Sequence, residues 1–280
     1  MFPTLENPFT PKSQIPQRRL FGEEAVSKRK LSIKSQEQIT KTKKELEKIK
    51  YGEHEIMANQ AQFLFDAEKI LITNYQEKGE VLTENEARDK IFYQVMSGVK
   101  IPRIEVDDSG NIINLDLLDL KLGKLPESIR NLIYLESLNC VRNDLINLPP
   151  RFGKLRNLKN LNCMDNNFTE LPQEVLSLTN LLALDLSGNK LQELPAEINK
   201  MQKLQILTVG YNPLKEISPE VGELLNLELL SLTQCHLNKL PKEIGQLKNL
   251  KILFADHNNF SAGEKEKIKE MMPENCRIDF

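Results

Sequence analysis

Few residues of this 280-residue chain have types and spacings that could support chemistry. Histidines could act as bases or metal ligands, and cysteines as nucleophiles, metal ligands or disulfide partners. Seven such residues are spread along the chain: His54, His236, His257, Cys140, Cys163, Cys235 and Cys276. No C-x-x-C, H-E-x-x-H, G-x-S-x-G, Walker-type or G-x-G-x-x-G motif accompanies them. The sequence therefore predicts a protein that is not an enzyme, with no catalytic residues, no cofactor and no bound metal.

Composition and charge exclude further classes. The formal net charge is −2, and 40% apolar residues are enough for a packed core. The basic excess is confined to residues 1–50, which carry 12 Lys and Arg against 6 Asp and Glu. No apolar run resembles a secretory signal or approaches the ~20 residues that span a bilayer. We expect a cytoplasmic monomer that binds neither nucleic acid nor membrane.

A 23-residue period organises residues 112–260. Repeat positions 1, 4, 6, 11, 14, 18 and 21 are apolar in all six complete units. One such unit buries too little apolar surface to offset the conformational entropy that folding costs, so the units must stack and the two ends need caps. The seven units begin, without any insertion, at Ile112, Leu135, Leu158, Leu181, Leu204, Leu227 and Leu250.

This pattern resembles the leucine-rich repeat family, whose units read L-x-x-L-x-L-x-x-N-x-L followed by x-x-L-P-x-x-I-x-x-L-x-x. The 23-residue spacing is similar to that of intracellular Ras-group and many bacterial members. The resemblance implies an α/β, right-handed solenoid, or horseshoe, with a parallel sheet on its concave side. It also implies a ladder of buried asparagines at repeat position 9, where Leu120 and Cys235 stand in two of the seven units. The ladder asparagines are Asn143, Asn166, Asn189, Asn212 and Asn258.

The concave face is the predicted binding surface, because members of the family usually bind protein partners there. Strand alternation directs repeat positions 3, 5 and 7 outward, and positions 8 and 10 continue that surface. Its first half is polar and its second half aliphatic and aromatic, with Tyr211 and Phe254 as expected anchors. The predicted partner-binding residues are Ile206, Tyr211, Leu229, His236, Ile252, Phe254, His257, Arg142 and Asp185.

Two alternatives concern this core region. A row of oxygen ligands on the polar half could hold a hard cation, although a row does not form a cage: Asp116, Asn139, Asn162, Asp165 and Asp185. Cys140 and Cys163 share repeat position 6 on adjacent strands, near disulfide range, and we interpret them as small buried hydrophobes.

For the whole chain, the resemblance to the family implies a scaffold or adaptor that binds a signalling protein, with GTPases among the candidate partners.

The flanking segments complete the predicted domain organisation. Residues 1–35 are expected to be a disordered basic tail, and residues 36–111 a helical N-terminal region with a capping hairpin. That region should contain a helix over about 44–75, a second helix from the capping box at 83–86 to about 98, and the hairpin at 103–117. Residues 261–280 should form a C-terminal cap of one helix and one strand. The helical region is either a cap on the first repeat, or a separate effector or dimerisation module that carries the activity while the repeats select the target.

Overall fold

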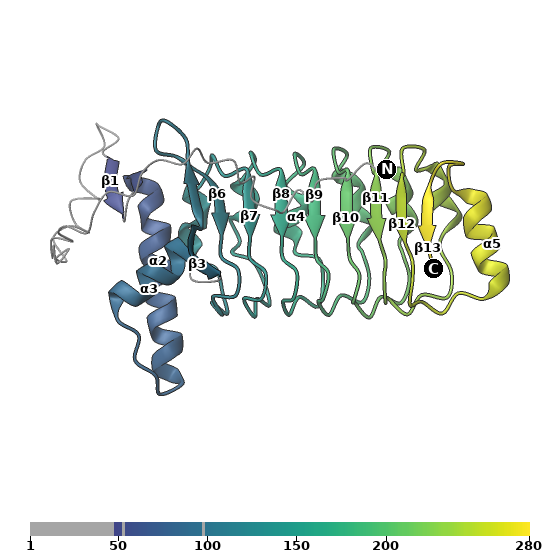
Figure 1. The fold of residues 1–280 in the computed structure, drawn as a ribbon. Coiled ribbons are helices and arrows are strands. Elements are labelled where there is room, and N and C mark those ends of the chain that lie inside the picture. The colour runs from purple at the N-terminus through teal and green to yellow at the C-terminus, as the bar shows by residue number, and fades with distance from the viewer. Residues whose placement is uncertain (1–47, 52–53, 97–98) are drawn as a thin grey trace.

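The computed structural model describes residues 48–51, 54–96 and 99–280, so the predicted basic tail lies outside the described residues. The repeat units place their strands side by side in a nine-stranded sheet of order β13-β12-β11-β10-β9-β8-β7-β6-β5 (Figure 1). All pairs from β6 to β13 are parallel, as the predicted solenoid requires. Their bounds are β6 Ile112–Asp116, β7 Ser137–Asn139, β8 Asn160–Asn162, β9 Ala183–Asp185, β10 Ile206–Thr208, β11 Leu229–Ser231, β12 Ile252–Phe254 and β13 Arg277–Asp279.

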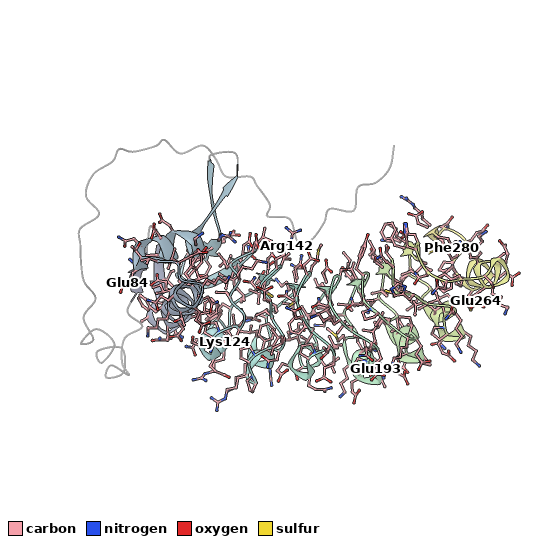
Figure 2. All side chains as sticks on the ribbon, turned by 90° about the horizontal axis from the view of Figure 1, so that it is seen from below. Glu84, Lys124, Arg142, Glu193, Glu264 and Phe280 are labelled. Carbon is pink, nitrogen blue, oxygen red and sulfur yellow. The ribbon has the colours of Figure 1, made fainter. Side chains whose placement is uncertain are left out.

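Short helices return the chain along the side opposite the sheet. Most of them follow a proline, which fixes φ near the helical value and has no N–H to leave unpaired at a helix start. Figure 2 shows this arrangement from below, with Arg142 on the sheet side and Lys124 and Glu193 on the helical side. The helices are η1 Glu127–Asn131, η2 Phe152–Lys154, α4 Gln173–Leu176, η3 Ala196–Lys200, η4 Pro219–Glu223 and η5 Lys242–Gln246, all 3-10 except α4.

One continuous core fills the space between sheet and helices. All 42 apolar positions predicted from the six complete units are buried. The same cluster extends at both ends beyond the repeats, from Ile56 to Met272. The α/β repeat solenoid predicted from the sequence is therefore confirmed.

The N-terminal end of the core is covered by helix α2, Ala58–Glu77. Gln60 is fully buried and takes the place of a preceding repeat: its Oε1 accepts a hydrogen bond from the Ile112 N–H at 2.7 Å, and its Nε2 donates to Asn111 Oδ1 at 3.0 Å. Further along α2, Asn74 Nδ2 donates to the Lys121 carbonyl oxygen at 2.8 Å. These contacts join the helix to the first unit.

The helix predicted over 44–75 is wrong at its start. Residues Lys48–Tyr51 and His54–Met57 form strands β1 and β2, which pair antiparallel. The sequence of β1, Lys-Ile-Lys-Tyr, alternates charged with apolar or aromatic residues, which is the period of a strand rather than a helix. The seven-residue spacing of Ile49 and Ile56, taken as a helical stripe, instead places the two residues opposite each other in this hairpin.

The second predicted helix begins as expected but is shorter. Helix α3, Glu84–Phe92, starts with a complete capping box, in which the Thr83 N–H donates to Glu86 Oε2 at 2.9 Å and the Glu86 N–H donates to Thr83 Oγ1 at 3.3 Å. It ends at Phe92, and strand β3, Tyr93–Met96, then pairs antiparallel with β4, Val99–Pro102. The β-formers in this stretch override the helical spacing.

Both ends of the sheet are closed by short elements. Strand β5, Ile104–Val106, pairs antiparallel with β6 across a turn in which Asp107 Oδ1 accepts the N–H groups of Ser109 and Asn111, each at 2.9 Å. At the other end lies helix α5, Ala262–Met271, followed by β13. The hairpin and the helix-strand cap expected from the sequence are both present.

Candidate functional site

A ladder of asparagine side chains fixes the loops where the strands end. Each ladder asparagine donates from Nδ2 to a carbonyl oxygen 26 residues earlier, for example from Asn189 to Cys163 at 3.0 Å. Its Oδ1 accepts an N–H of the preceding unit, as from Phe168 at 3.1 Å. Cys235 donates from Sγ to the Val209 carbonyl at 3.3 Å in the same way. These bonds satisfy buried backbone groups, so the rims of the concave face are rigid.

A second ladder, which the sequence analysis missed, runs along the opposite loops at repeat position 23. Each of its asparagines donates to a carbonyl oxygen 24 residues earlier, and the recurrence at a period of 23 was the available signal. The donors and distances are Asn157 at 2.7 Å, Asn180 at 2.7 Å, Asn226 at 2.8 Å and Asn249 at 2.8 Å. Both edges of the strands are therefore tied from unit to unit.

Repeat position 8 has a left-handed backbone in all seven units. Gly188 adopts it with φ of 67° at no steric cost, but the other units hold side chains there, at φ between 53° and 57°. Tyr211 is the bulkiest of them and is 57% exposed. A left-handed, exposed aromatic residue costs about 1–2 kcal/mol that glycine would avoid. Because all seven units share this conformation, the loop geometry imposes it, and it does not by itself single out Tyr211. The remaining members are Asp119, Arg142, Asp165, Gln234 and His257.

The aliphatic residues predicted to bind a partner form one row on the outward face of the sheet. Ile206, Leu229 and Ile252 are Cα partners across β10, β11 and β12, and each is half-buried. Phe254 is half-buried on β12, one outward position along the strand. We call Ile206, Leu229 and Ile252 the aliphatic row.

The polar half of the face has a local structural role that the sequence analysis did not foresee. At repeat position 5, four Asp or Asn side chains accept the N–H two residues on; in β9, Asp185 Oδ1 accepts from Ser187 at 2.9 Å. They stabilise the strand ends in the manner of Asx turns. The other three are Asp116, Asn139 and Asn162, at 2.8, 3.2 and 3.0 Å.

The oxygen row considered as a cation site gains no support from this arrangement. Within the described ranges, no cluster of three or more His, Cys, Asp or Glu side chains is placed to hold a metal ion. Arg142 Nε donates to Asp165 Oδ2 at 3.2 Å, so one carboxylate of the row is already paired with a cation.

An apolar row at repeat position 7 interrupts the half described as polar. Leu118, Val141 and Met164 are buried or half-buried at the outward face, and the same position is Ser187 in the next unit. The sequence analysis assigned position 7 to this face but did not follow it from unit to unit. The apolar surface thus lies at one end of the strands in the first units and at the other end in the last units.

The two histidines of the predicted site are exposed at the rim. His257 Nδ1 lies 2.6 Å from Asp256 Oδ2, and Asp256 Oδ1 accepts from the Thr233 hydroxyl at 2.7 Å. His236 lies at repeat position 10 with φ of 61°. These contacts orient the rim side chains.

The four cysteines are free, and the pKa values of Cys163, Cys235 and Cys276 are raised. Cys140 and Cys163 are buried with their Sγ atoms 3.2 Å apart, and that hydrogen bond together with burial raises the pKa of Cys163 well above its ordinary value of 9.0. Burial raises the pKa of Cys235 to about 11. Thiolates, the reactive form, are thereby disfavoured.

Comparisons with known proteins agree with the repeat pattern. The family described as Leucine rich repeat matches residues 156–214. A search of curated proteins finds no match.

In the part of the chain that the structure describes, no helix has the length and apolarity needed to cross a membrane.

Three solved structures are similar to this chain over part of its length. A leucine-rich repeat protein of Leptospira interrogans is 33% identical over 56% of this chain and 52% of its own, with a TM-score of 0.36. The internalin inlF of Listeria monocytogenes is 21% identical over 59% and 54%, with a TM-score of 0.46. The plant peptide hormone receptor RGFR1, solved in complex with RGF2, is 22% identical over 56% and 33%, with a TM-score of 0.45. The chain spans between a third and about half of the length of these proteins.

Proposed function

We propose that this chain, whose repeats match the Leucine rich repeat family over residues 156–214, is a scaffold or adaptor that binds a protein partner through the second half of its concave face. The observation that carries the proposal is Tyr211, a 57% exposed aromatic side chain that lies just beyond the end of β10, the strand that carries Ile206 of the aliphatic row. An exposed aromatic side chain on the same surface as half-buried aliphatic ones is typical of protein-binding sites.

The site is rigid in the way that recognition requires. Both loop edges of the strands are tied by asparagine ladders, and the strands themselves are paired in register. A preorganised surface loses little conformational entropy on binding, so more of the contact energy contributes to affinity.

We assign residues 58–92 to an N-terminal cap rather than to a separate effector module. Gln60 completes the hydrogen bonding of the first repeat strand, and Asp66 hydrogen-bonds Ser128 in the first return helix. Buried residues of α2 belong to the same core as the repeats. Helix α2 shields that core from solvent, which is the role of a capping element, and removing it would expose the core.

The test compares two variants at the same repeat position. Tyr211→Gly and Gln234→Gly both relieve a left-handed backbone, at φ of 56° and 53°, so both should fold with stability equal to or above that of the unchanged chain. Only the first removes a proposed anchor. In affinity capture from native cells quantified by mass spectrometry, Tyr211→Gly should reduce recovery of the partner at least tenfold, since loss of an aromatic anchor costs about 2 kcal/mol or more.

The Gln234→Gly variant should retain the partner. Equal recovery by Tyr211→Gly, Gln234→Gly and the unchanged chain would reject this surface as the binding site. Circular dichroism and melting temperatures of both variants would establish that the comparison is between folded proteins.

A further inference from the structure

We infer that the partner element seated on this surface is an amphipathic α-helix with a basic flank, lying across the strands along the aliphatic row. The inference rests on the proposed function and specifies the chemistry of the partner. Three features of the surface point to it: the spacing of the row, the small side chains beside it, and its charge.

The spacing of the row matches a helix better than an extended peptide. Ile206, Leu229 and Ile252 stand on neighbouring strands in register, so they are about 4.8 Å apart and the outer two about 10 Å. Residues i, i+3 or i+4, and i+7 of a helix rise about 5 and 10.5 Å along one face. Same-face residues of an extended peptide are about 6.7 Å apart and would be about 13 Å apart after two steps, out of register with the row.

The row has defined ends. Towards β9 it meets Ala183, which is buried and small, and towards β13 it meets Arg277, which is exposed and donates to Asp279 Oδ2 at 2.7 Å. The apolar contact therefore extends over about two helical turns, which is the length of the i, i+4, i+7 anchor patterns by which helices dock on apolar surfaces.

Small side chains border the row on the side of Tyr211. Thr208 and Ser231 occupy the next outward position of β10 and β11, and Gly210 follows β10. At Gly210 a Cβ would stand 3.0 Å from the Thr233 carbonyl oxygen. Small residues let a helix backbone approach the sheet closely, while Tyr211 stands exposed at the strand ends.

Two carboxylates give the surface its charge preference. Within the described residues, Asp185 forms no ion pair and the one basic group beside Asp256 is the His257 ring, at 2.6 Å, whereas Glu228 and Asp279 are paired with Lys251 and Arg277 at 2.6 and 2.7 Å. Asp185 and Asp256 carry repeat positions 5 and 7, on the same side of the row as the small residues. A helix with Lys or Arg on the flank that faces them is therefore electrostatically complementary.

The experiment sorts displayed peptide libraries on the purified full-length chain. Four yeast-displayed libraries of 18-residue segments carry apolar residues either at helical spacing (i, i+4, i+7) or in strict alternation, each with Lys/Arg or with Asp/Glu at the polar positions. The helical basic library should be enriched. Enrichment of the alternating or of the acidic libraries instead, or no enrichment of the helical basic library, would overturn the inference.

Variants locate the binding. The double variant Leu229→Thr/Ile252→Thr keeps β-forming residues on the strands but removes the row, and it should weaken enriched clones at least tenfold. The control Ile146→Thr changes an exposed aliphatic residue elsewhere, 66% exposed, and should have no effect. Asp185→Asn keeps the hydrogen bond to the Ser187 N–H, as Asn139 and Asn162 do in their units, and should weaken basic clones severalfold.

The outcomes separate the two proposals. Alternating clones that lose binding with the row variant would reject the helix while leaving the concave-face function intact. If enriched clones bind the row variant and Tyr211→Gly as tightly as they bind the unchanged chain, this surface is not the binding site, and both proposals are rejected.

Discussion

Replacing Asn189 with alanine should lower the free energy of unfolding by about 2–4 kcal/mol, because it removes a buried link between repeat units. Asn189 is 6% exposed. Its Nδ2 donates to the carbonyl oxygens of Cys163 and Leu186 at 3.0 and 2.9 Å, and its Oδ1 accepts from the Phe168 N–H at 3.1 Å. Alanine cannot make any of these bonds.

The size of this loss of stability follows from the buried backbone groups that lose their partner when Asn189 is replaced. A typical hydrogen bond contributes about 0.5–1.5 kcal/mol net, and a buried backbone group without a partner costs about 1–3 kcal/mol. Because the losses at one side chain are not additive, we expect the total to stay within about 2–4 kcal/mol rather than reach the sum of all terms.

The matched control is Asn180→Ala in the second ladder. Asn180 Nδ2 donates to the Arg156 carbonyl oxygen at 2.7 Å, and Asn180 Oδ1 accepts from Lys203 Nζ at 2.7 Å; both bonds are exposed, so water can replace them. Urea denaturation followed by circular dichroism should show a loss below about 1 kcal/mol for Asn180→Ala and the larger loss for Asn189→Ala, at similar slopes. Equal losses for the two variants would refute the reasoning that burial makes the first ladder costly to break.

Further predictions concern backbone packing, an unpaired hydroxyl and pH. Gly222→Ala should lower the free energy of unfolding by about 1–3 kcal/mol, because the added Cβ would stand 2.2 Å from a backbone oxygen of helix η5. Gly263→Ala places its Cβ in open space inside α5 and should raise the free energy of unfolding by about 0.5–1 kcal/mol. Equal shifts of the denaturant midpoint for the two variants would contradict this. Thr208→Val should raise stability by about 1 kcal/mol in thermal melts, since no described residue partners the buried Thr208 hydroxyl, and a clear loss would show that the hydroxyl is bonded. Hydrogen bonds from the Thr83 N–H and hydroxyl hold the pKa of Glu86 below its ordinary 4.5. The stability difference between the unchanged chain and Glu86→Ala should therefore be complete above pH 4.5 and shrink as the pH falls through the lowered pKa. A difference that does not change with pH would count against the capping box.

The repeat region was predictable in detail because every unit places apolar and asparagine residues at the same repeat positions. The apolar positions, the ladder asparagines and the closing hairpin were all predicted from the sequence and found in the structure. The capping box at Thr83 was equally legible, since both of its partners are three residues apart.

The N-terminal region was predicted less well because it occurs once. With no second copy to average over, the spacing of Ile49 and Ile56 fitted a helix as well as a hairpin, and the pairing of β1 with β2 decides against the helix. The buried role of Gln60 carried no local signal, because its hydrogen-bond partner is 52 residues away.

The sequence by itself determined which side chains are inside, because burial at a fixed period is written into every unit of 23 residues. Only the tertiary structure decided which outward side chains share a surface. Strand pairing places residues 23 apart at neighbouring sites, so that Ile206 and Leu229 meet in one row while Leu118 and Met164 lie towards the other end of the strands. It also set the left-handed backbone at Tyr211, which lies exposed beyond the end of β10, a conformation imposed by the loop geometry and not by the tyrosine.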